Sequence, residues 1–340
     1  MDTGHWESDN LLTDVLKNFF LQVPFKCFHE KLKEYTIREI NVLFPSTFFH
    51  EINQKYPLKK SYQVSFLKTI LQELEGRNED VDEKVYHYYL KLLEQPESET
   101  HYIHYMISED QFITVLQNTS TISDGTTGLS VWQVFVFFQA GKMLADYCLK
   151  NIHSFEKQNV LELGCGVGLT GLAVIFACKP SSYCFTDIHE KVLNYLESNI
   201  KLNVAITRCL TEANISYFES SDVETKISII NLPWENVDSN LTDSIKPDII
   251  LAADVVYDTT LFHPFCRAVN EFVRRNKEVR ILIACTVRNS LTLEEFCLVL
   301  HQYNLVEKEI EAVTTWNSSF NDKCQVKIFS ILPVPTSKYA

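Results

Sequence analysis

A glycine-rich turn between a short apolar run and a second apolar stretch constrains the fold of this chain most strongly. Residues 159–171 read N-V-L-E-L-G-C-G-V-G-L-T-G, so that glycine recurs at Gly164, Gly166 and Gly168. Residues 160–163 have the length of a strand, and residues 169–177 are apolar enough for a buried helix. A strand that turns through glycines into a helix brings bare backbone and a helix N-terminus close to a ligand. The pattern therefore favours a binding site.

Downstream of this turn, strand-like and helix-like stretches alternate, which is typical of a parallel α/β sheet. The patterns predict strands at 160–163, 183–186, 227–230, 249–253 and 279–286, followed by two more near 305–313 and 324–332. They predict helices at 169–178, 190–202, 260–275 and 292–303, and an apolar helix upstream at 129–149. Ligands of doubly wound sheets bind at the carboxyl ends of the strands, so we expect functional residues directly after strands.

The first hundred residues have a different character. Apolar residues recur there at helical spacing, and Pro24, Pro45 and Pro57 divide them into separate helices. Residues 101–107 and 111–117 are strand-like and flank a short polar turn, which predicts a β-hairpin. We therefore expect an N-terminal helical domain at 1–95, a β-hairpin bridge at 96–128 and an α/β domain at 129–340.

Charge and composition narrow the class of protein. The formal net charge of −13 argues against a broad nucleic-acid-binding surface, so we expect no direct nucleic-acid binding. We expect no membrane span, because no stretch reaches the ~20 apolar residues that a span needs. The N-terminus is acidic and polar, unlike a targeting peptide. Ten cysteines without a C-x-x-C pair favour reduced thiols, and we predict a cytoplasmic protein.

Two acidic residues bear on the cofactor. Gly166, Gly168 and Gly171 also fit the dinucleotide fingerprint G-x-G-x-x-G, so the glycines alone leave the cofactor open. Glu162 lies two residues before the first glycine and tilts the interpretation away from a nicotinamide dinucleotide. Asp187 follows the second predicted strand, 19 residues after Gly168, where a carboxylate accepts hydrogen bonds from ribose hydroxyls. Its alternative role is to cap the next helix.

Other polar or aromatic residues follow later strands or precede the glycine turn. Trp234 is placed to stack on an adenine ring or to pack in the core. Asp254 and Tyr257 end an apolar strand and are candidate catalytic residues, Asp254 to hold an amine or the cofactor and Tyr257 to line an acceptor channel. The alternative is a capping aspartate and a packed tyrosine. Arg288 is a candidate contact for an acidic substrate or a structural residue, and Trp132 is a core residue or covers the ligand cleft.

Three segments carry a family resemblance. The sequence E-x-G-x-G-x-G at 162–168 resembles motif I of the class I, seven-strand S-adenosylmethionine methyltransferases. Residues 160–202, the A-A-D-V-V-Y that ends at Tyr257, and the V-W at Trp132 resemble the seven-strand protein-lysine methyltransferases. Residues 125–132 and 286–289, with the helical N-terminus, resemble the elongation factor 2 lysine methyltransferase family.

The resemblance implies a fold, a cofactor and a substrate. It implies a class I methyltransferase, α/β with a doubly wound seven-strand sheet and an N-terminal helical domain, in which 129–340 is the S-adenosylmethionine-dependent domain. The enzyme would methylate a lysine of elongation factor 2, a protein partner, with S-adenosyl-L-methionine as cofactor. Some cofactor-binding residues are implied by the resemblance and others follow from the sequence patterns above. Together they are Trp132, Glu162, Gly164, Cys165, Gly166, Gly168, Asp187, Trp234 and Ala253. Related enzymes often have aspartate after the tryptophan, whereas this chain has Gln133, to which we assign no role.

Three other functions remain open at this point. One is a class I methyltransferase that acts on another protein, RNA or a small molecule. The second is an NAD-dependent oxidoreductase, which shares the glycine turn but does not call for Glu162 or the D-V-V-Y segment. The third is an interaction protein with a vestigial site. The sequence shows no catalytic triad or metal cluster, which suits methyl transfer, because orientation and desolvation of the reactants are its main requirements.

Overall fold

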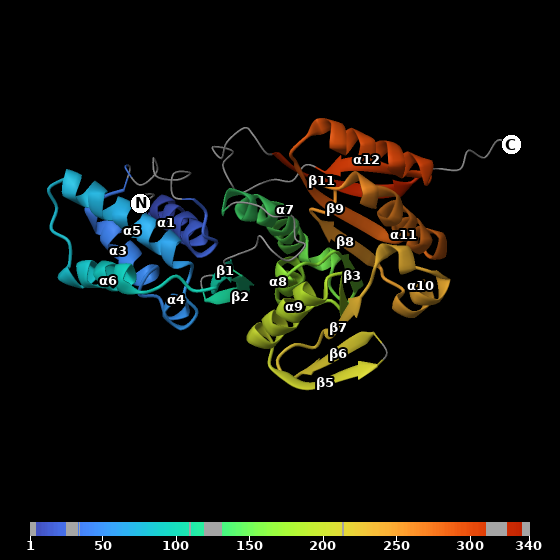
Figure 1. Ribbon diagram of the computed structural model, residues 1–340, viewed down its shortest axis with the longest axis horizontal. Helices are drawn as coiled ribbons and strands as arrows, with labels where there is room; N and C mark the ends of the chain where they lie inside the picture. Colours follow the sequence, from blue (N-terminus) through green and yellow to red (C-terminus); the bar gives the residue numbers. More distant parts are fainter. Residues whose placement is uncertain are drawn as a thin grey trace. The chain divides into compact units, whose positions relative to one another are not determined.

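The computed structural model describes residues 5–24, 33, 35–108, 110–118, 131–212, 214–310 and 325–334. These residues belong to two compact units, residues 1–128 and 129–340 (Figure 1). The helical N-terminal region and the α/β region that the sequence predicts are both present. The boundary of the predicted bridge at 95/96 stays a prediction. In the described part of the chain, no helix has the length and apolar character that a membrane span requires.

The first unit contains helices and one hairpin. Its helices are α1 (His5–Phe20), α3 (Ile37–Ser46), α4 (Glu51–Lys55), α5 (Lys60–Gly76) and α6 (Glu83–Glu94), and its strands are β1 (Thr100–Ser108) and β2 (Gln111–Asn118). Three phenylalanines from α1, α5 and the turn after α3 form the centre of its core. The ring of Phe19 lies 5.0 Å from the rings of both Phe48 and Phe66, centroid to centroid. The hairpin packs against these helices through Phe112, whose ring lies 5.1 Å from that of Phe20.

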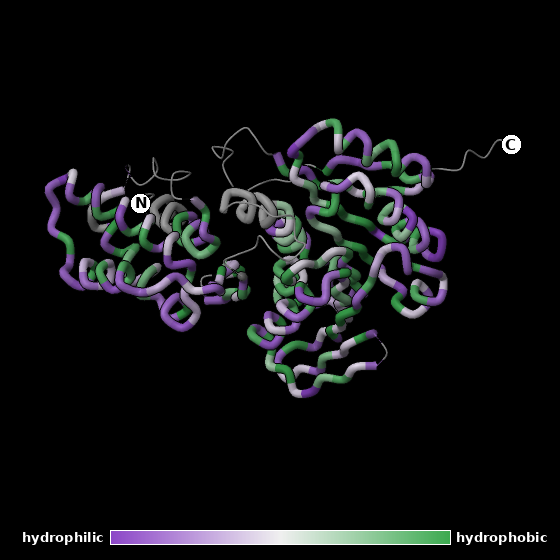
Figure 2. The backbone as a smooth tube through the Cα atoms, viewed as in Figure 1, coloured by the Kyte–Doolittle hydropathy of each residue, from purple (hydrophilic) through white to green (hydrophobic). Residues whose placement is uncertain are grey.

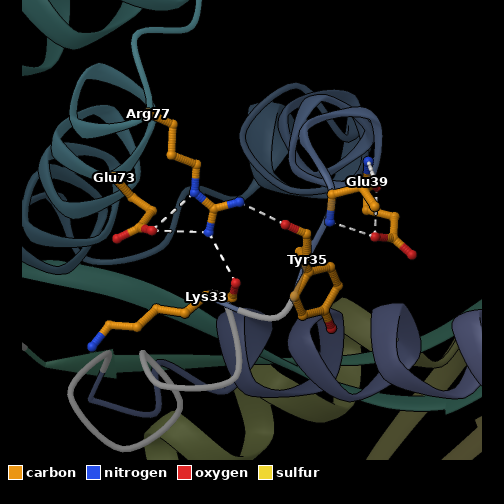
Figure 3. Close-up of polar contacts among 6 residues, drawn as sticks. Lys33, Tyr35, Glu39, Glu73 and Arg77 are labelled. Atoms are coloured by element: carbon orange, nitrogen blue, oxygen red, sulfur yellow. Dashed lines mark hydrogen bonds and ion pairs between the residues drawn. The ribbon is translucent and has the colours of Figure 1, made fainter.

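Arg77, at the end of α5, ties this helix to the segment before α3 (Figure 3). Its guanidinium donates to Glu73 Oε1 from Nε and Nη2, at 3.0 and 2.9 Å, and to the carbonyl oxygen of Tyr35 at 2.7 Å. The neighbouring Thr36 begins α3 with a capping box, in which Thr36 and Glu39 each accept a hydrogen bond from the other's backbone N–H. Polar contacts thus fix the entry into α3.

The second unit is built on a nine-stranded sheet in the order β10-β11-β9-β8-β3-β4-β7-β6-β5. The strands are β3 (Asn159–Leu163), β4 (Ser182–Asp187), β5 (Ile206–Glu212), β6 (Ile215–Ser220), β7 (Lys226–Asn231), β8 (Ile249–Ala253), β9 (Arg280–Val287), β10 (Leu305–Ile310) and β11 (Gln325–Pro333). The five central strands, from β9 to β7, are parallel, whereas β11, β10, β6 and β5 each pair in an antiparallel manner. All seven strands predicted for this unit are confirmed, as is the hairpin predicted in the first unit.

Helices cover both faces of this sheet. One face carries α7 (Val131–Lys150), α8 (Leu169–Cys178) and α9 (Glu190–Asn203); the other carries α10 (Ser239–Ile245), α11 (Phe262–Arg275) and α12 (Ser290–Gln302) (Figure 1). From β3 the chain proceeds to β4 and β7 in one direction, and it later adds β8 and β9 on the other side of β3. The strand order therefore reverses between β3 and β8, the position where doubly wound sheets bind ligands.

The sheet is hydrophobic along its central strands, as parallel strands covered on both faces require (Figure 2). Phe262, Phe265 and Phe296 from α11 and α12 are buried against one face. On the other face, Gly171 lets α8 approach β4 closely, because a Cβ at Gly171 would lie 2.1 Å from Phe185 Cε1. The doubly wound α/β fold that the sequence predicts is thus confirmed by the topology, with nine strands in the sheet where the resemblance implied seven.

Two strands and one helix were not predicted. The hairpin of β5 and β6 extends the sheet beyond β7, and α10 precedes β8. All residues of β5 after Ile206 are exposed, so the strand carries no apolar run or alternation by which a sequence pattern would reveal it. Helix α10 has seven residues, which is too short for a clear helical period.

Candidate active site

The glycine turn after β3 adopts a backbone that other residues rarely adopt. Gly164, Gly166 and Gly168 have φ angles of +71°, +54° and +88°. A Cβ at Gly164 would lie 3.0 Å from Val255 Cγ1, and one at Gly168 would lie 2.4 Å from Leu196 Cδ1. At Gly166, by contrast, a Cβ would meet no atom within 4 Å. Two of the glycines thus permit close packing, and Gly166 leaves bare backbone facing open space, as a binding loop requires.

Neighbouring elements hold this turn in place. The N–H of Cys165 donates to the carbonyl oxygen of Thr186 on β4 at 2.9 Å. Asn199, buried on α9, donates from Nδ2 to the carbonyl oxygen of Val167 at 3.0 Å. The role of Asn199 was not predicted from the sequence. The sequence feature that could have indicated this role is the position of a polar residue on the apolar face of α9, between Leu196 and Ile200.

Asp187, at the end of β4, lies beside the turn. Its Oδ2 accepts a hydrogen bond from the N–H of Gly166 at 3.2 Å, and its Oδ1 accepts one from the N–H of His189 at 3.1 Å. The N-cap of α9 is His189, so Asp187 does not occupy the capping position that was its alternative role. The structure brings together the glycine turn and the carboxylate that the sequence singled out.

Glu162 lies beneath the turn, inside the sheet. Only 1% of its surface is exposed, and its Oε2 accepts a hydrogen bond from the hydroxyl of Tyr183 at 2.8 Å. Burial raises the pKa of Glu162 to about 8, more than the hydrogen bonds from Tyr183 and Thr170 lower it. Thr186 donates to the carbonyl oxygen of Glu162 at 2.7 Å. These bonds join β3 to β4 directly below the glycines.

Asp254 follows β8 at the same edge of the sheet, in a left-handed backbone conformation with a φ of 56°. Its Oδ2 accepts a hydrogen bond from Arg288 Nη2 at 2.5 Å, and its Oδ1 accepts one from the N–H of Thr286 at 3.3 Å. Its own N–H donates to the carbonyl oxygen of Ala284 at 2.8 Å. Burial raises the pKa of Asp254, and the charge of Arg288 opposes that rise. Asp254 therefore connects the ends of β8 and β9.

Tyr257 is exposed over 42% of its surface and borders a small hollow. The hollow is also lined by residues from the end of β9 and the start of α12: Cys285, Thr286, Val287, Arg288, Asn289, Thr292 and Leu293, together with Val256. Partial burial raises the pKa of Tyr257, and the negative charges of Asp187, Asp258 and Asp254 raise it further. The phenol therefore stays protonated at neutral pH and presents a hydroxyl at the carboxyl edge of the sheet.

The remaining predicted site residues lie near the turn or outside the described residues. Trp234 packs edge-on against Phe265, with ring centroids 4.9 Å apart, and its Cζ2 lies 3.6 Å from the position of a Cβ on Gly164. Ala253 is half-buried at the end of β8. Trp132 belongs to α7, but its side chain and residues 119–130 lie outside what the structure describes.

This arrangement fits an adenosine-containing cofactor. The glycine turn has open space at Gly166, and the carboxylate of Asp187 lies within hydrogen-bonding distance of that backbone. The half-buried ring of Trp234 lies against the same turn. Backbone N–H groups, a carboxylate for hydroxyl groups and a flat apolar ring are the contacts that a nucleoside with a charged tail requires.

Comparison with known proteins decides the family. Residues 117–301, more than half of the chain, match a family model described as lysine methyltransferase. The chain belongs to the lysine methyltransferase family. Membership confirms the predicted resemblance at family level, the enzyme class and S-adenosylmethionine as cofactor.

Individual relatives of this lysine methyltransferase cover most of its length. The protein-lysine N-methyltransferase EEF2KMT of Bos taurus is 28% identical over 295 residues, which cover 84% of this chain and 85% of the relative. The putative protein N-methyltransferase FAM86B1 of Homo sapiens is 27% identical over 277 residues, 80% of each chain. Among solved structures, magnesium protoporphyrin IX methyltransferase from Synechocystis PCC 6803 is 12% identical, with a TM-score of 0.38 over 60% of this chain and 86% of that chain.

Proposed function

We propose that this protein-lysine methyltransferase modifies a lysine of translation elongation factor 2, in the cytoplasm. The supporting observation is its similarity to proteins named EEF2KMT from Bos taurus, Homo sapiens and Mus musculus, at 26–28% identity over 80–84% of this chain. The alternative is a class I methyltransferase that acts on another protein, RNA or a small molecule. The net charge of −13 counts against RNA, because a phosphate backbone is repelled by an acidic surface.

We propose that the carboxyl ends of β3, β4 and β8 hold the cofactor. The backbone of Gly164, Cys165 and Gly166 lines it, and Asp187 accepts hydrogen bonds from its ribose hydroxyls. The positions that complete the cofactor site are Trp132, Trp234 and Ala253, while Glu162 and Gly168 keep the turn in shape. S-adenosylmethionine supplies a methyl group on a sulfonium, an electrophile that needs no further activation.

On the acceptor side, we propose that Asp254 and Tyr257 position the lysine amine. Both oxygens of Asp254 already accept hydrogen bonds, from Arg288 and Thr286, so this carboxylate is held in one orientation. A carboxylate held in one orientation offers a hydrogen-bond acceptor to an approaching ammonium group, which has to lose a proton before it acts as a nucleophile. The neutral hydroxyl of Tyr257 borders the hollow and limits the directions from which the amine approaches. The proton leaves to water or to a nearby carboxylate.

We propose that the N-terminal unit takes part in selecting the protein substrate. The tyrosines of α6, Tyr86, Tyr88 and Tyr89, are half-buried. Tyr88 is engaged inside the unit, because its hydroxyl donates to Gln63 Oε1 at 3.0 Å. The exposed apolar residues of α6 are instead Leu90 and Leu93, at 55% and 47%. They are the better candidates for contact with a large partner.

The substrate assignment is tested by methylation of purified elongation factor 2 with isotope-labelled S-adenosylmethionine, next to a whole-cell lysate. We expect label on a lysine of elongation factor 2 in both samples. Label on a different lysate protein, with none on the purified factor, would overturn the substrate and leave the lysine methyltransferase activity standing. The Leu90→Ser/Leu93→Ser variant should methylate the factor more slowly at unchanged cofactor affinity if the N-terminal unit takes part. Wild-type rates would refute that part.

A further inference from the structure

Helix α12 has an inner face that is part of the core and an outer face with an unusual composition. On the inner face, Phe296, Val299 and Leu300 are buried at 1%, 6% and 0% exposure. They join the apolar cluster that packs on the strands of the second unit. This packing fixes the rotation of the helix about its axis, and so determines which residues face solvent.

The outer face carries two leucines with two glutamates between them. Leu291 and Leu298 are 68% and 63% exposed, more than any other large apolar side chain in the described ranges. Glu294 and Glu295 are also exposed. Because residues three, four and seven apart lie on one side of a helix, these four form a single stripe. We refer to Leu291, Glu294, Glu295 and Leu298 as the α12 stripe.

The α12 stripe begins beside the hollow that Tyr257 borders. Thr292 and Leu293, in the first turn of α12, line that hollow. The start of the helix is fixed by Asn289, whose Oδ1 accepts a hydrogen bond from the N–H of Leu291 at 3.0 Å. At 1.5 Å per residue, the stripe extends about 10 Å from the hollow along the helix. A polypeptide with one side chain at the hollow would have its next residues over this stripe.

We propose that the α12 stripe docks the segment of the protein substrate that adjoins the acceptor lysine, and that this segment carries an apolar side chain flanked by basic residues. The proposal rests on the proposed methylation of a protein lysine, but not on which protein is modified. Covering the exposed leucines with an apolar side chain of a partner removes apolar surface from water and so favours binding. The two carboxylates between the leucines favour lysine or arginine on that partner. The net charge of −13 also attracts a basic segment.

Two double variants test the proposal, Leu291→Ser/Leu298→Ser and Glu294→Lys/Glu295→Lys. We expect each to raise the KM for the protein substrate about tenfold, with kcat and the affinity for S-adenosylhomocysteine unchanged. Wild-type activity should fall between about 50 and about 300 mM salt, since added salt screens the attraction between the glutamates and a basic segment. The activity of the Glu294→Lys/Glu295→Lys variant should not fall over this range. Rates are measured on purified elongation factor 2 and on whichever lysate polypeptide the wild type labels.

Matched controls lie at the opposite edge of the same sheet. Ile152→Ser removes an exposed apolar side chain upstream of β3, and Glu278→Lys reverses a charge in the turn before β9. A KM for the stripe variants equal to that of these controls would overturn the proposal. So would a loss of thermal stability or cofactor affinity that matches the loss of activity, because the stripe would then support the fold. If only a lysate protein other than elongation factor 2 is labelled, the substrate assignment fails and the docking is judged on that protein.

Discussion

The ion pair between Asp254 and Arg288 joins the ends of β8 and β9, and Arg288→Met is expected to weaken the second unit. Asp254 is 8% exposed, and the pair is 2.5 Å long between Asp254 Oδ2 and Arg288 Nη2. A hydrogen bond to a charged group contributes about 1.5–3 kcal/mol to stability. The side chain of Arg288 is 31% exposed, so solvent screening lowers this contribution, and we expect a loss of about 2 kcal/mol. For a unit of this size, the loss corresponds to a fall in Tm of about 4–8 °C.

The pH dependence of that loss identifies its cause. Burial already raises the pKa of Asp254 in the folded protein above its usual value, and Arg288 opposes the rise. A carboxyl whose folded pKa is raised contributes stability at low pH, and this contribution is lost as pH rises through the folded pKa. Removing Arg288 raises that pKa further, so the stability of the variant falls more steeply as pH rises. The difference in stability between wild type and variant should therefore be larger at neutral pH than at acid pH.

Differential scanning calorimetry of wild type and Arg288→Met measures this difference at about pH 7.5 and about pH 4.5. We expect the gap in Tm to be several degrees at the higher pH and to narrow at the lower one. The control is Arg275→Met, which breaks an ion pair with Asp243 in which both side chains are 48% exposed, and which should change Tm little at either pH. An equal gap for Arg288→Met at both pH values would refute the electrostatic reasoning and assign the effect to packing.

Three further predictions concern the glycine turn and its support. Asp187→Ala should weaken the binding of S-adenosylhomocysteine by about 1.5–3 kcal/mol per lost bond at most and leave the protein folded; calorimetric titration measures it, and wild-type affinity with a lowered Tm would assign Asp187 a structural role only. Glu162→Gln should flatten the pH dependence of stability between about pH 4.5 and about pH 8, because the contribution of the protonated carboxyl to wild-type stability is fully present below the unfolded pKa and is lost as pH rises to the folded pKa of about 8; parallel curves from urea unfolding would contradict that assignment. Gly171→Ala should unfold the second unit, because its Cβ would lie 2.1 Å from Phe185 Cε1, whereas Gly166→Ala should leave a folded protein with reduced cofactor affinity. Circular dichroism measures folding and titration measures cofactor affinity, and a folded Gly171→Ala variant would contradict the packing argument.

Much of the second unit was predictable from the sequence because local patterns determine it. The apolar runs of β3 and β8 and the glycines between β3 and α8 mark a strand–turn–helix unit by themselves. The position of Asp187 after β4 follows from the same alternation, and the structure places its carboxylate against Gly166. Since the carboxyl ends of parallel strands meet at one edge, naming the strands was enough to bring these groups together.

Long-range pairings were not predictable in the same way. Arg288 was a candidate for contact with an acidic substrate or for a structural role, and the structure pairs it with Asp254, 34 residues earlier in the chain. Neither residue carries a local signal of that pairing, which depends on β8 and β9 being neighbours in the sheet. Asn199 likewise supports the turn from α9 across 32 residues. The burial of Glu162, which places its carboxyl beneath the glycines, also follows only from the assembled sheet.

The most direct test of the cofactor site is calorimetric titration of the purified chain with S-adenosylhomocysteine and, separately, with NAD. Both ligands contain adenosine and suit a glycine turn followed by an acidic residue after the second strand. The arrangement of Gly166, Asp187 and Asp254 at three strand ends predicts saturable binding of S-adenosylhomocysteine at one site and no heat with NAD. Binding of NAD without binding of S-adenosylhomocysteine would contradict the assignment of this edge of the sheet to methyl transfer.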